Sequence, residues 1–173
     1  MTIAVHHSAQ LWDIAGVDGL QVMKKLFGKT VDRIALFQSI DVTLDETHSI
    51  LRLCEGNFRI AWYGNPELFE QPIQQAKIGD RVWVKRLDWM VTLLLNESAR
   101  LELTTLAIPK PPHRLHSLPL NCAVPARIEG ISVLIWHHLV SEQPCFELQM
   151  ARDDLEPIKA KLSLQHSLSP QQT

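Results

Sequence analysis

Apolar and polar residues alternate along two neighbouring stretches of the chain, 87–95 and 101–107, on either side of a polar break at 96–98. In the first stretch, the odd-numbered positions carry large apolar side chains: Leu87, Trp89, Val91, Leu93 and Leu95. In the second stretch, the odd-numbered positions are again mostly apolar: Leu101, Leu103, Thr105 and Ala107. Pairing Leu95 with Ala99 would place both sets on one face, as a half-buried antiparallel hairpin requires. The pattern therefore predicts a β-rich globular protein.

Other segments have the spacing of strands or helices. Apolar residues recur every three or four positions over Gln10–Phe27, with glycines at 16 and 19, which predicts a short first helix carrying Trp12 and a second helix from Asp18. Further strands are expected at Arg33–Gln38, Ser49–Cys54, Phe58–Tyr63, Arg81–Arg86, Ile131–Val140 and Cys145–Met150. A helical turn is expected around Glu67–Gln71, and a helix from Asp153 or Asp154 to about Leu162.

Together these elements predict one α+β domain over residues 1–163. Its fold class is a strongly bent antiparallel sheet or partly open β-barrel with short N- and C-terminal helices. A corner is expected at Arg86–Asp88, because the apolar positions change there from even-numbered to odd-numbered. The segment Pro109–Pro125 holds five of the ten prolines and is expected to be an extended surface connection. Residues 164–173 are expected to form a flexible C-terminal tail.

Composition narrows the class of protein. The chain has 173 residues, of which 46% are hydrophobic and 21% charged, so it can bury a core and is not of the disordered class. Its apolar runs are too short to cross a bilayer as a helix, and its first residues lack the pattern of a signal peptide. We therefore expect a cytoplasmic protein with no membrane partner. The net charge of −2 excludes a protein that coats nucleic acid by charge alone.

The chemistry-bearing residues form no recognisable motif. His137 and His138 are adjacent on an expected strand, so their side chains point to opposite faces and cannot chelate one metal. The three cysteines have no metal-finger spacing, there is no Gly-x-Ser-x-Gly elbow, and no glycine-rich loop precedes a helix. Pairs such as Cys54 with His48 or Cys145 with His137 remain open. We expect no catalytic residue, no metal site and no cofactor.

One surface stands out as a candidate for nucleic-acid or partner binding. Trp83 shares a strand face with Arg81 and Lys85, an arrangement in which an aromatic ring can stack on a base while cations contact phosphates. The alternative is that the corner turns Trp83 inward. Trp62 and Trp89 each lie on the same strand face as aliphatic neighbours and are expected in the core. The full candidate set is Arg81, Trp83, Lys85, Arg86, Lys110, Arg114 and Arg127.

Three short features carry a resemblance to a known family. They are Leu36-Phe37, the strand Arg59-Ile60-Ala61-Trp62, and Leu118-Pro119-Leu120 followed by the hairpin Val133–Met150 with Arg152 after it. In these features the chain resembles the small accessory subunit of type III-D CRISPR effector complexes, although the insertion Ile40–Ser49 departs from that pattern. The resemblance implies a non-catalytic subunit within an RNA-guided complex and carries over no functional residue.

Three functions follow as hypotheses. The first is a non-catalytic binding or assembly subunit, with other protein subunits as partners and RNA as a further candidate partner. The second is a small-ligand-binding β-barrel of lipocalin-like shape, which requires an apolar cavity closed by the hairpin Ile131–Met150. The third is a small enzyme that uses Cys or His, which requires a thiol within hydrogen-bond reach of an imidazole.

Overall fold

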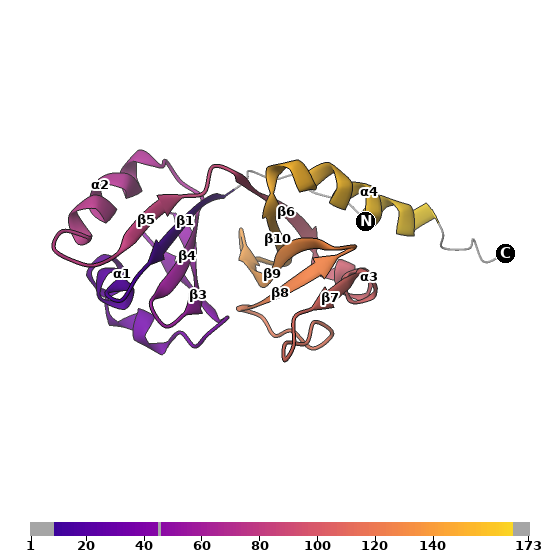
Figure 1. The fold of residues 1–173 in the computed structure, drawn as a ribbon, viewed down its shortest axis with the longest axis horizontal. Coiled ribbons are helices and arrows are strands. Elements are labelled where there is room, and N and C mark those ends of the chain that lie inside the picture. Colours follow the sequence, from indigo (N-terminus) through magenta and orange to yellow (C-terminus); the bar gives the residue numbers. More distant parts are fainter. Residues whose placement is uncertain (1–8, 45, 168–173) are drawn as a thin grey trace.

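A computed structural model describes residues 9–44 and 46–167, without the side chains of 163–167. Within these residues, the chain forms two five-stranded antiparallel sheets and four α-helices (Figure 1). The N-terminal sheet consists of β1 (Gln10–Ala15), β2 (Ser39–Thr43), β3 (Thr47–Cys54), β4 (Asn57–Trp62) and β5 (Trp83–Arg86). The C-terminal sheet consists of β6 (Met90–Asn96), β7 (Ala107–Pro109), β8 (Cys122–Ile128), β9 (Ile131–Val140) and β10 (Gln143–Ala151).

The strand order is β2-β3-β4-β1-β5 in the N-terminal sheet and β6-β10-β9-β8-β7 in the C-terminal sheet. The helices are α1 (Gly19–Phe27), α2 (Glu67–Ala76), α3 (Arg100–Leu106) and α4 (Leu155–Ser167), with 3-10 helices at Lys29–Arg33, Glu97–Ala99 and Arg152–Asp154. No helix in the described ranges is long and apolar enough to cross a membrane.

The two sheets pack against each other, and each carries helices on its other side (Figure 1). Side chains of α1 and α2 share a core with one face of the N-terminal sheet, and side chains of α3 and α4 share a second core with one face of the C-terminal sheet. A third apolar cluster joins the inner faces and includes Leu11, Leu51 and Trp136. Because side chains alternate along a strand, each sheet supplies one face to its helices and one to the other sheet.

The expected corner after β5 is where the chain changes sheets. β5 ends at Arg86 and β6 begins at Met90, with the amide of Leu87 donating to the carbonyl of Leu11 at 2.8 Å. The change from even-numbered to odd-numbered apolar positions therefore reflects a move from one sheet to the other. A second contact between the sheets lies just before β2, where the amide of Ala123 in β8 donates to the carbonyl of Phe37 at 2.8 Å.

At the end of β1, glycines allow the backbone to contact the turn between β3 and β4. The amide of Gly16 donates to the carbonyl of Gly56 at 3.2 Å, and a Cβ on Gly19 would lie 1.9 Å from that same carbonyl oxygen. Gly16 has a φ of +148°, which favours glycine. The two glycines that interrupt the helix-like spacing are thus required by close backbone approach.

The first helix expected from the sequence is wrong, because residues 10–15 form β1. Leu11, Trp12 and Ile14 are all buried, since β1 is covered by helices on one side and by the C-terminal sheet on the other. Strands buried on both faces lose their alternation. The second expected helix is confirmed as α1.

The hairpin expected over 87–107 is also wrong in its second strand. Residues 97–106 are helical, and β6 pairs with β10, placing Leu95 opposite Phe146. The buried residues of the helical segment and its end are Ala99, Leu103 and Ala107, which lie four apart, whereas Leu101 is 78% exposed. The buried residues therefore recur every four positions, as in a helix, although the apolar residues of this segment also occupy every second position, as in a strand.

The expected strand Arg33–Gln38 is replaced by the end of a 3-10 helix and a turn in which Phe37 has a φ of 58°. The strands Ser49–Cys54 and Phe58–Tyr63 and the hairpin of Ile131–Val140 with Cys145–Met150 are confirmed, within a few residues, as β3, β4, β9 and β10. The C-terminal helix, expected to end near Leu162, extends to Ser167, and 168–173 lie outside the described residues. That residues 1–163 are one domain stays a prediction.

The α+β class and the antiparallel pairing are confirmed, but no closed barrel forms among the described residues. The described residues form two sheets and not one closed sheet, so the closed barrel that the lipocalin-like alternative requires around its ligand is absent from them. The hairpin that was expected to close a barrel instead supplies two central strands of the C-terminal sheet, β9 and β10.

Candidate functional site

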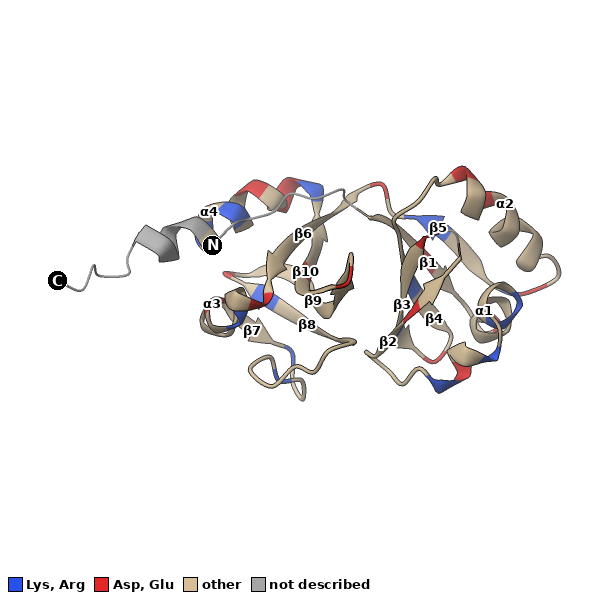
Figure 2. Cartoon of the chain, turned by 180° about the vertical axis from the view of Figure 1, so that it is seen from behind, with Lys and Arg blue, Asp and Glu red and all other residues tan. Residues whose placement is uncertain are grey.

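The candidate binding residues do not form one surface. Arg81, Trp83, Lys85 and Arg86 lie on or beside β5, at the edge of the N-terminal sheet. Lys110, Arg114 and Arg127 belong to the C-terminal half of the chain. Figure 2 shows Lys and Arg residues spread over both halves, with acidic residues between them.

The β5 residues differ in what they contact. Trp83 is 82% exposed, so the corner does not turn it inward. Arg81 forms an ion pair with Asp18 at 3.1 Å, and its hydrogen bonds lower the pKa of the Asp18 carboxyl. Arg86 forms an ion pair with Asp88 at 2.7 Å, which leaves Lys85 as the exposed cation beside Trp83 that has no ion-pair partner among the described residues.

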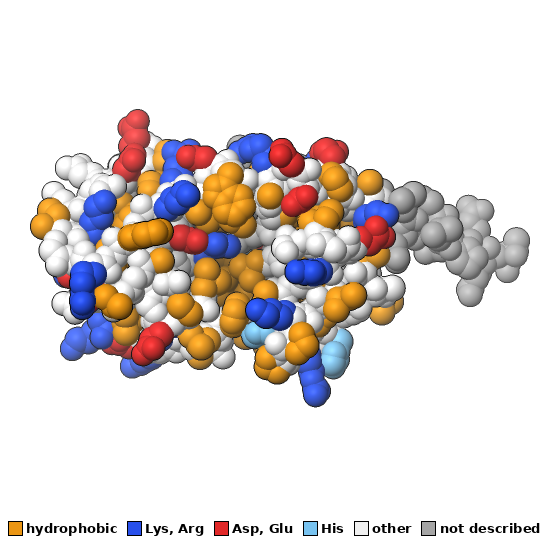
Figure 3. All heavy atoms as spheres, in the orientation of Figure 1, with side chains coloured by type: hydrophobic (Ala, Val, Ile, Leu, Met, Phe, Trp, Pro, Cys, Tyr) orange, Lys and Arg blue, Asp and Glu red, His pale blue; other side chains and the backbone are white. Residues whose placement is uncertain are grey.

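Two of the candidates, Lys110 and Arg127, line one groove of about 920 Å³ across the C-terminal sheet. We call it the central groove. Its other lining residues include Arg59, Trp89, Ile108 and Leu134. Figure 3 shows a hollow with an apolar floor in the middle of this face, with basic side chains around it. Arg114 is exposed and is not among the lining residues.

Trp89 was expected in the core, and this expectation is wrong. The ring is 54% exposed and stands at the groove, just before β6 begins. Trp62, which also shares parity with its own aliphatic neighbours, is buried under α2, where its ring stacks on Phe69 with centroids 4.6 Å apart. Shared parity with aliphatic residues is a guide within one strand, but Trp89 precedes its strand.

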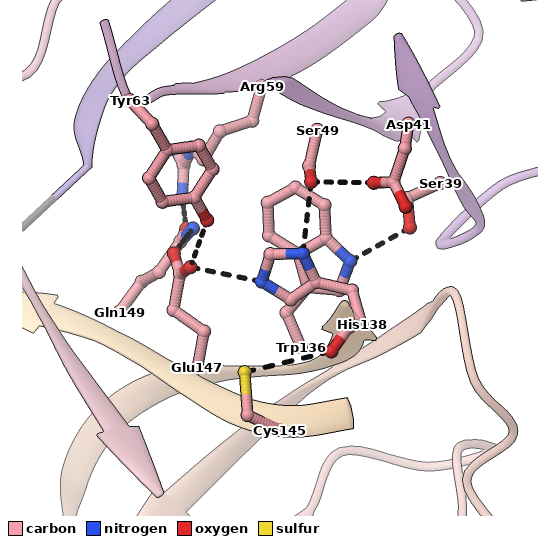
Figure 4. Close-up of polar contacts among 10 residues, drawn as sticks. All are labelled: Ser39, Asp41, Ser49, Arg59, Tyr63, Trp136, His138, Cys145, Glu147 and Gln149. Carbon is pink, nitrogen blue, oxygen red and sulfur yellow. Dashed lines mark hydrogen bonds and ion pairs between the residues drawn. The ribbon is translucent and has the colours of Figure 1, made fainter. Parts of the chain in front are cut away.

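A chain of buried and half-buried polar side chains adjoins the groove at Arg59 and Gln149 and joins the two sheets; Figure 4 draws all of its members except Asp13. We call it the inter-sheet polar cluster; its members are Asp13, Ser39, Asp41, Ser49, Arg59, Tyr63, Trp136, His138, Glu147 and Gln149. At its centre His138 Nε2 lies 3.0 Å from Glu147 Oε2, and both side chains are completely buried. Tyr63 donates its hydroxyl to the same carboxylate oxygen at 3.1 Å, and Gln149 donates to Glu147 Oε1 at 2.8 Å.

The hydrogen bonds assign a charge to His138. Ser49 donates its hydroxyl proton to Asp41 at 2.7 Å, so its oxygen is left to accept from His138 Nδ1 at 3.1 Å. His138 Nε2 faces the Glu147 carboxylate, which accepts only. In this hydrogen-bond pattern both ring nitrogens donate, which is the arrangement of an imidazolium paired with a carboxylate. Without this pairing each charge would be far too costly to bury.

The cluster continues to the groove through Arg59. Its guanidinium donates to both carboxylate oxygens of Asp13, at 2.7 and 2.8 Å, and to Gln149 Oε1 at 3.0 Å. Because Arg59 and Gln149 also line the groove, the groove floor is held by the same hydrogen bonds that hold the sheets together.

Ser49, His138 and Glu147 include the residue types of a hydrolase triad, but their environment does not suit catalysis. Ser49 is almost completely buried, and its proton is already donated to Asp41. A nucleophilic serine needs an open side towards the substrate and a neutral base that accepts its proton. This geometry stabilises the packing of the two sheets.

The thiols lack the neighbour that the enzyme hypothesis requires. Cys145 donates to the backbone carbonyl of His138 at 3.6 Å, and burial raises the pKa of this thiol to about 12. Burial also raises the pKa of Cys122, whereas Cys54 is exposed. No thiol–imidazole hydrogen bond and no cluster of three metal-ligating side chains occurs among the residues that the structure describes.

These environments predict the order in which the cysteines react. At pH 8 we expect Cys54 to react quickly with a disulfide reagent, and Cys145 to hold on the order of 1000-fold less thiolate than an ordinary cysteine and to react only on unfolding. The measurement is thiol titration of the native and the urea-unfolded protein, with Cys54→Ser as the control that removes the fast phase. Fast labelling of Cys145 in the native protein would contradict the prediction.

Sequence reasoning missed the inter-sheet polar cluster. One signal was available: β10 places Glu147 and Gln149 among Cys145, Phe146, Leu148 and Met150, all of which are buried. A carboxylate inside such an apolar strand must have buried partners. Those partners lie on β9 and on the other sheet, so the sequence could indicate that they exist but not which residues they are.

Comparisons with known proteins bear on the fold. No protein-family model matches the sequence, and no curated protein matches it either. Among solved structures, aminomethyltransferase T of the glycine cleavage system from Bartonella henselae is similar over 90% of this chain at 15% identity, with a TM-score of 0.69. The chain spans 43% of the length of that protein.

A second similar structure is the heterotetrameric sarcosine oxidase from Corynebacterium sp. U-96, in complex with pyrrole 2-carboxylate. The similarity covers 98% of this chain and 85% of the matched chain, at 21% identity and a TM-score of 0.69. These findings overturn the resemblance to a CRISPR accessory subunit, whose three short features were too unspecific to define a family. The chain has a fold that is also found in the aminomethyltransferase and in a chain of the sarcosine oxidase.

Proposed function

We propose that this chain is a non-catalytic assembly subunit that binds another protein subunit. The observation that carries the proposal is the likeness to a chain of a heterotetrameric enzyme, of which this chain covers 85%. In that enzyme, a polypeptide consisting almost entirely of this fold occurs beside other subunits. A subunit of this kind contributes surface and rigidity, and it needs no catalytic residues of its own.

The internal chemistry supports this role. The hydrogen bonds from Tyr63 to Glu147 and between His138 and Ser49 fix the two sheets relative to each other, and a fixed arrangement loses little freedom when a partner binds. Exposed aromatic and apolar side chains, Trp83 on β5 and Trp89 with Ile108 at the central groove, provide the contacts that protein interfaces favour. In this proposal Arg81, Lys85 and Arg86 flank one contact, and Lys110 and Arg127 flank another.

The test is purification of the tagged chain from its native host in mild salt, followed by mass measurement and reconstitution from separately purified components. We expect a stoichiometric complex well above the 19.7 kDa of the chain, with slower amide exchange in β5 or around the central groove. A monomer of 19.7 kDa that assembles with no co-purifying protein would contradict the proposal.

A further inference from the structure

We propose that the central groove binds an extended acidic segment of a partner protein, with apolar side chains of that segment on the groove floor. This inference rests on the proposed function and names the contact through which assembly occurs. It is carried by the shape, the charge and the exposed apolar residues of the groove.

The shape favours a segment of polypeptide. All five strands of the C-terminal sheet contribute lining residues, from Met90 on β6 to Ile108 on β7. Four inter-strand spacings of about 4.8 Å give a span of about 19 Å, which an extended chain covers with about six residues. A compact small molecule would occupy only part of that length.

The charge favours an acidic occupant. The groove is lined by three cations, Arg59, Lys110 and Arg127, and by a single carboxylate, that of Asp154, whereas the whole chain has a net charge of −2. Arg59 is neutralised by Asp13. Lys110 and Arg127 are exposed and have no ion-pair partner among the described residues, so both are free to meet carboxylates of another chain.

The apolar residues supply the anchor. Ile108 is 74% exposed and Trp89 is 54% exposed, and both border a floor that includes Leu134 and Met150. Covering such side chains with a partner removes apolar surface from water, which stabilises the complex. Aromatic residues near the centre of an interface often dominate its affinity. The occupant we infer therefore alternates acidic with large apolar residues.

The first test uses the purified chain and fluorescence anisotropy with neutral-dye-labelled peptides of twelve residues. One peptide alternates Asp and Glu with Leu and Phe, a second has Lys at every acidic position, and a third has Ser at every apolar position. We expect only the first to bind, and Lys110→Glu with Arg127→Glu to weaken its binding at least about tenfold. The matched control is Lys29→Glu with Arg33→Glu, the same charge change at exposed residues outside the groove, which should leave binding unchanged.

Equal binding of the acidic and basic peptides would overturn the inference, as would equal binding by the groove variant and the wild type. Tighter, groove-dependent binding of a twelve-nucleotide RNA would overturn it in favour of a different occupant. A second test separates this inference from the proposed function by measuring assembly of the same variants with the co-purified subunit. If the groove variant assembles with the co-purified subunit as well as the wild type does, only the inference about the groove is wrong. If the acidic peptide binds to the groove but no assembly forms, only the proposed function is wrong.

Discussion

We expect Glu147→Gln to lower the free energy of unfolding by about 3–5 kcal/mol, because the variant leaves the imidazolium of His138 buried without a counter-charge. The NH2 group of the new amide also replaces one of the two acceptor oxygens, so it faces either the donor Gln149 at Oε1 or the donors Tyr63 and His138 at Oε2. The measurement is urea unfolding followed by tryptophan fluorescence.

Two further variants make this prediction specific. Glu142→Gln is the same chemical change at an exposed position in the β9–β10 turn, and it should change stability by less than about 0.5 kcal/mol. In a His138→Gln background, Glu147→Gln should cost clearly less than in the wild type, since the cation is already gone. Equal costs in both backgrounds would show that His138 is not charged in the folded protein.

Glu147→Gln should also change how the free energy of unfolding depends on pH in acid. Burial raises the pKa of Glu147, but the hydrogen bond and charge of His138, with the hydrogen bonds of Gln149 and Tyr63, hold that pKa below its ordinary value of 4.5. A lowered pKa gives stability that is present above about pH 4.5 and is lost as the pH falls through the lower value of the folded state. We expect the wild type to lose stability more steeply than Glu147→Gln in that window.

The sequence predicted the strands that tight turns join into hairpins. The strands β3 and β4 and the β9–β10 hairpin were expected within a few residues, since tight turns link them and their alternation is visible. β1 was taken for a helix because both of its faces are buried, a fact that depends on the other sheet. The helical segment 97–106 was taken for a strand because residues 101, 103, 105 and 107 fit a period of two as well as the four-residue period that the core requires.

Of the residues at the central groove, the sequence pointed to the two exposed cations but not to the aromatic residue or to the polar side chains between the sheets. Lys110 and Arg127 were expected as candidate binding residues, and the fold brings them to one groove, while Trp89 at the same groove was assigned to the core. The pair of Ser49 with His138 could not be predicted, because it joins positions 89 residues apart on different sheets. No periodicity within a strand encodes such a pair, which depends on how the two inner faces are matched.

We expect Trp136→Ala to lower the free energy of unfolding by about 3–5 kcal/mol, comparable to the loss of the buried charge. Trp136 is completely buried in the apolar cluster between the sheets, and its indole nitrogen donates to Ser39 Oγ at 2.9 Å across the interface. Trp136→Phe keeps most of the apolar volume and removes only the donor, so it should cost about 1–3 kcal/mol. Both values come from urea unfolding.

Trp83→Ala is the matched control, since it removes an exposed indole and should change stability by less than about 0.5 kcal/mol. The shape of the unfolding curve carries as much information as its midpoint. Because the sheets share an apolar cluster and are joined by the hydrogen bonds of Tyr63 with Glu147 and of Ser49 with His138, we expect the wild type to unfold in one transition by both fluorescence and circular dichroism. Two separate transitions in the wild type, or a Trp136→Ala variant as stable as Trp83→Ala, would mean that the sheets fold independently and that residues 1–163 are not one domain.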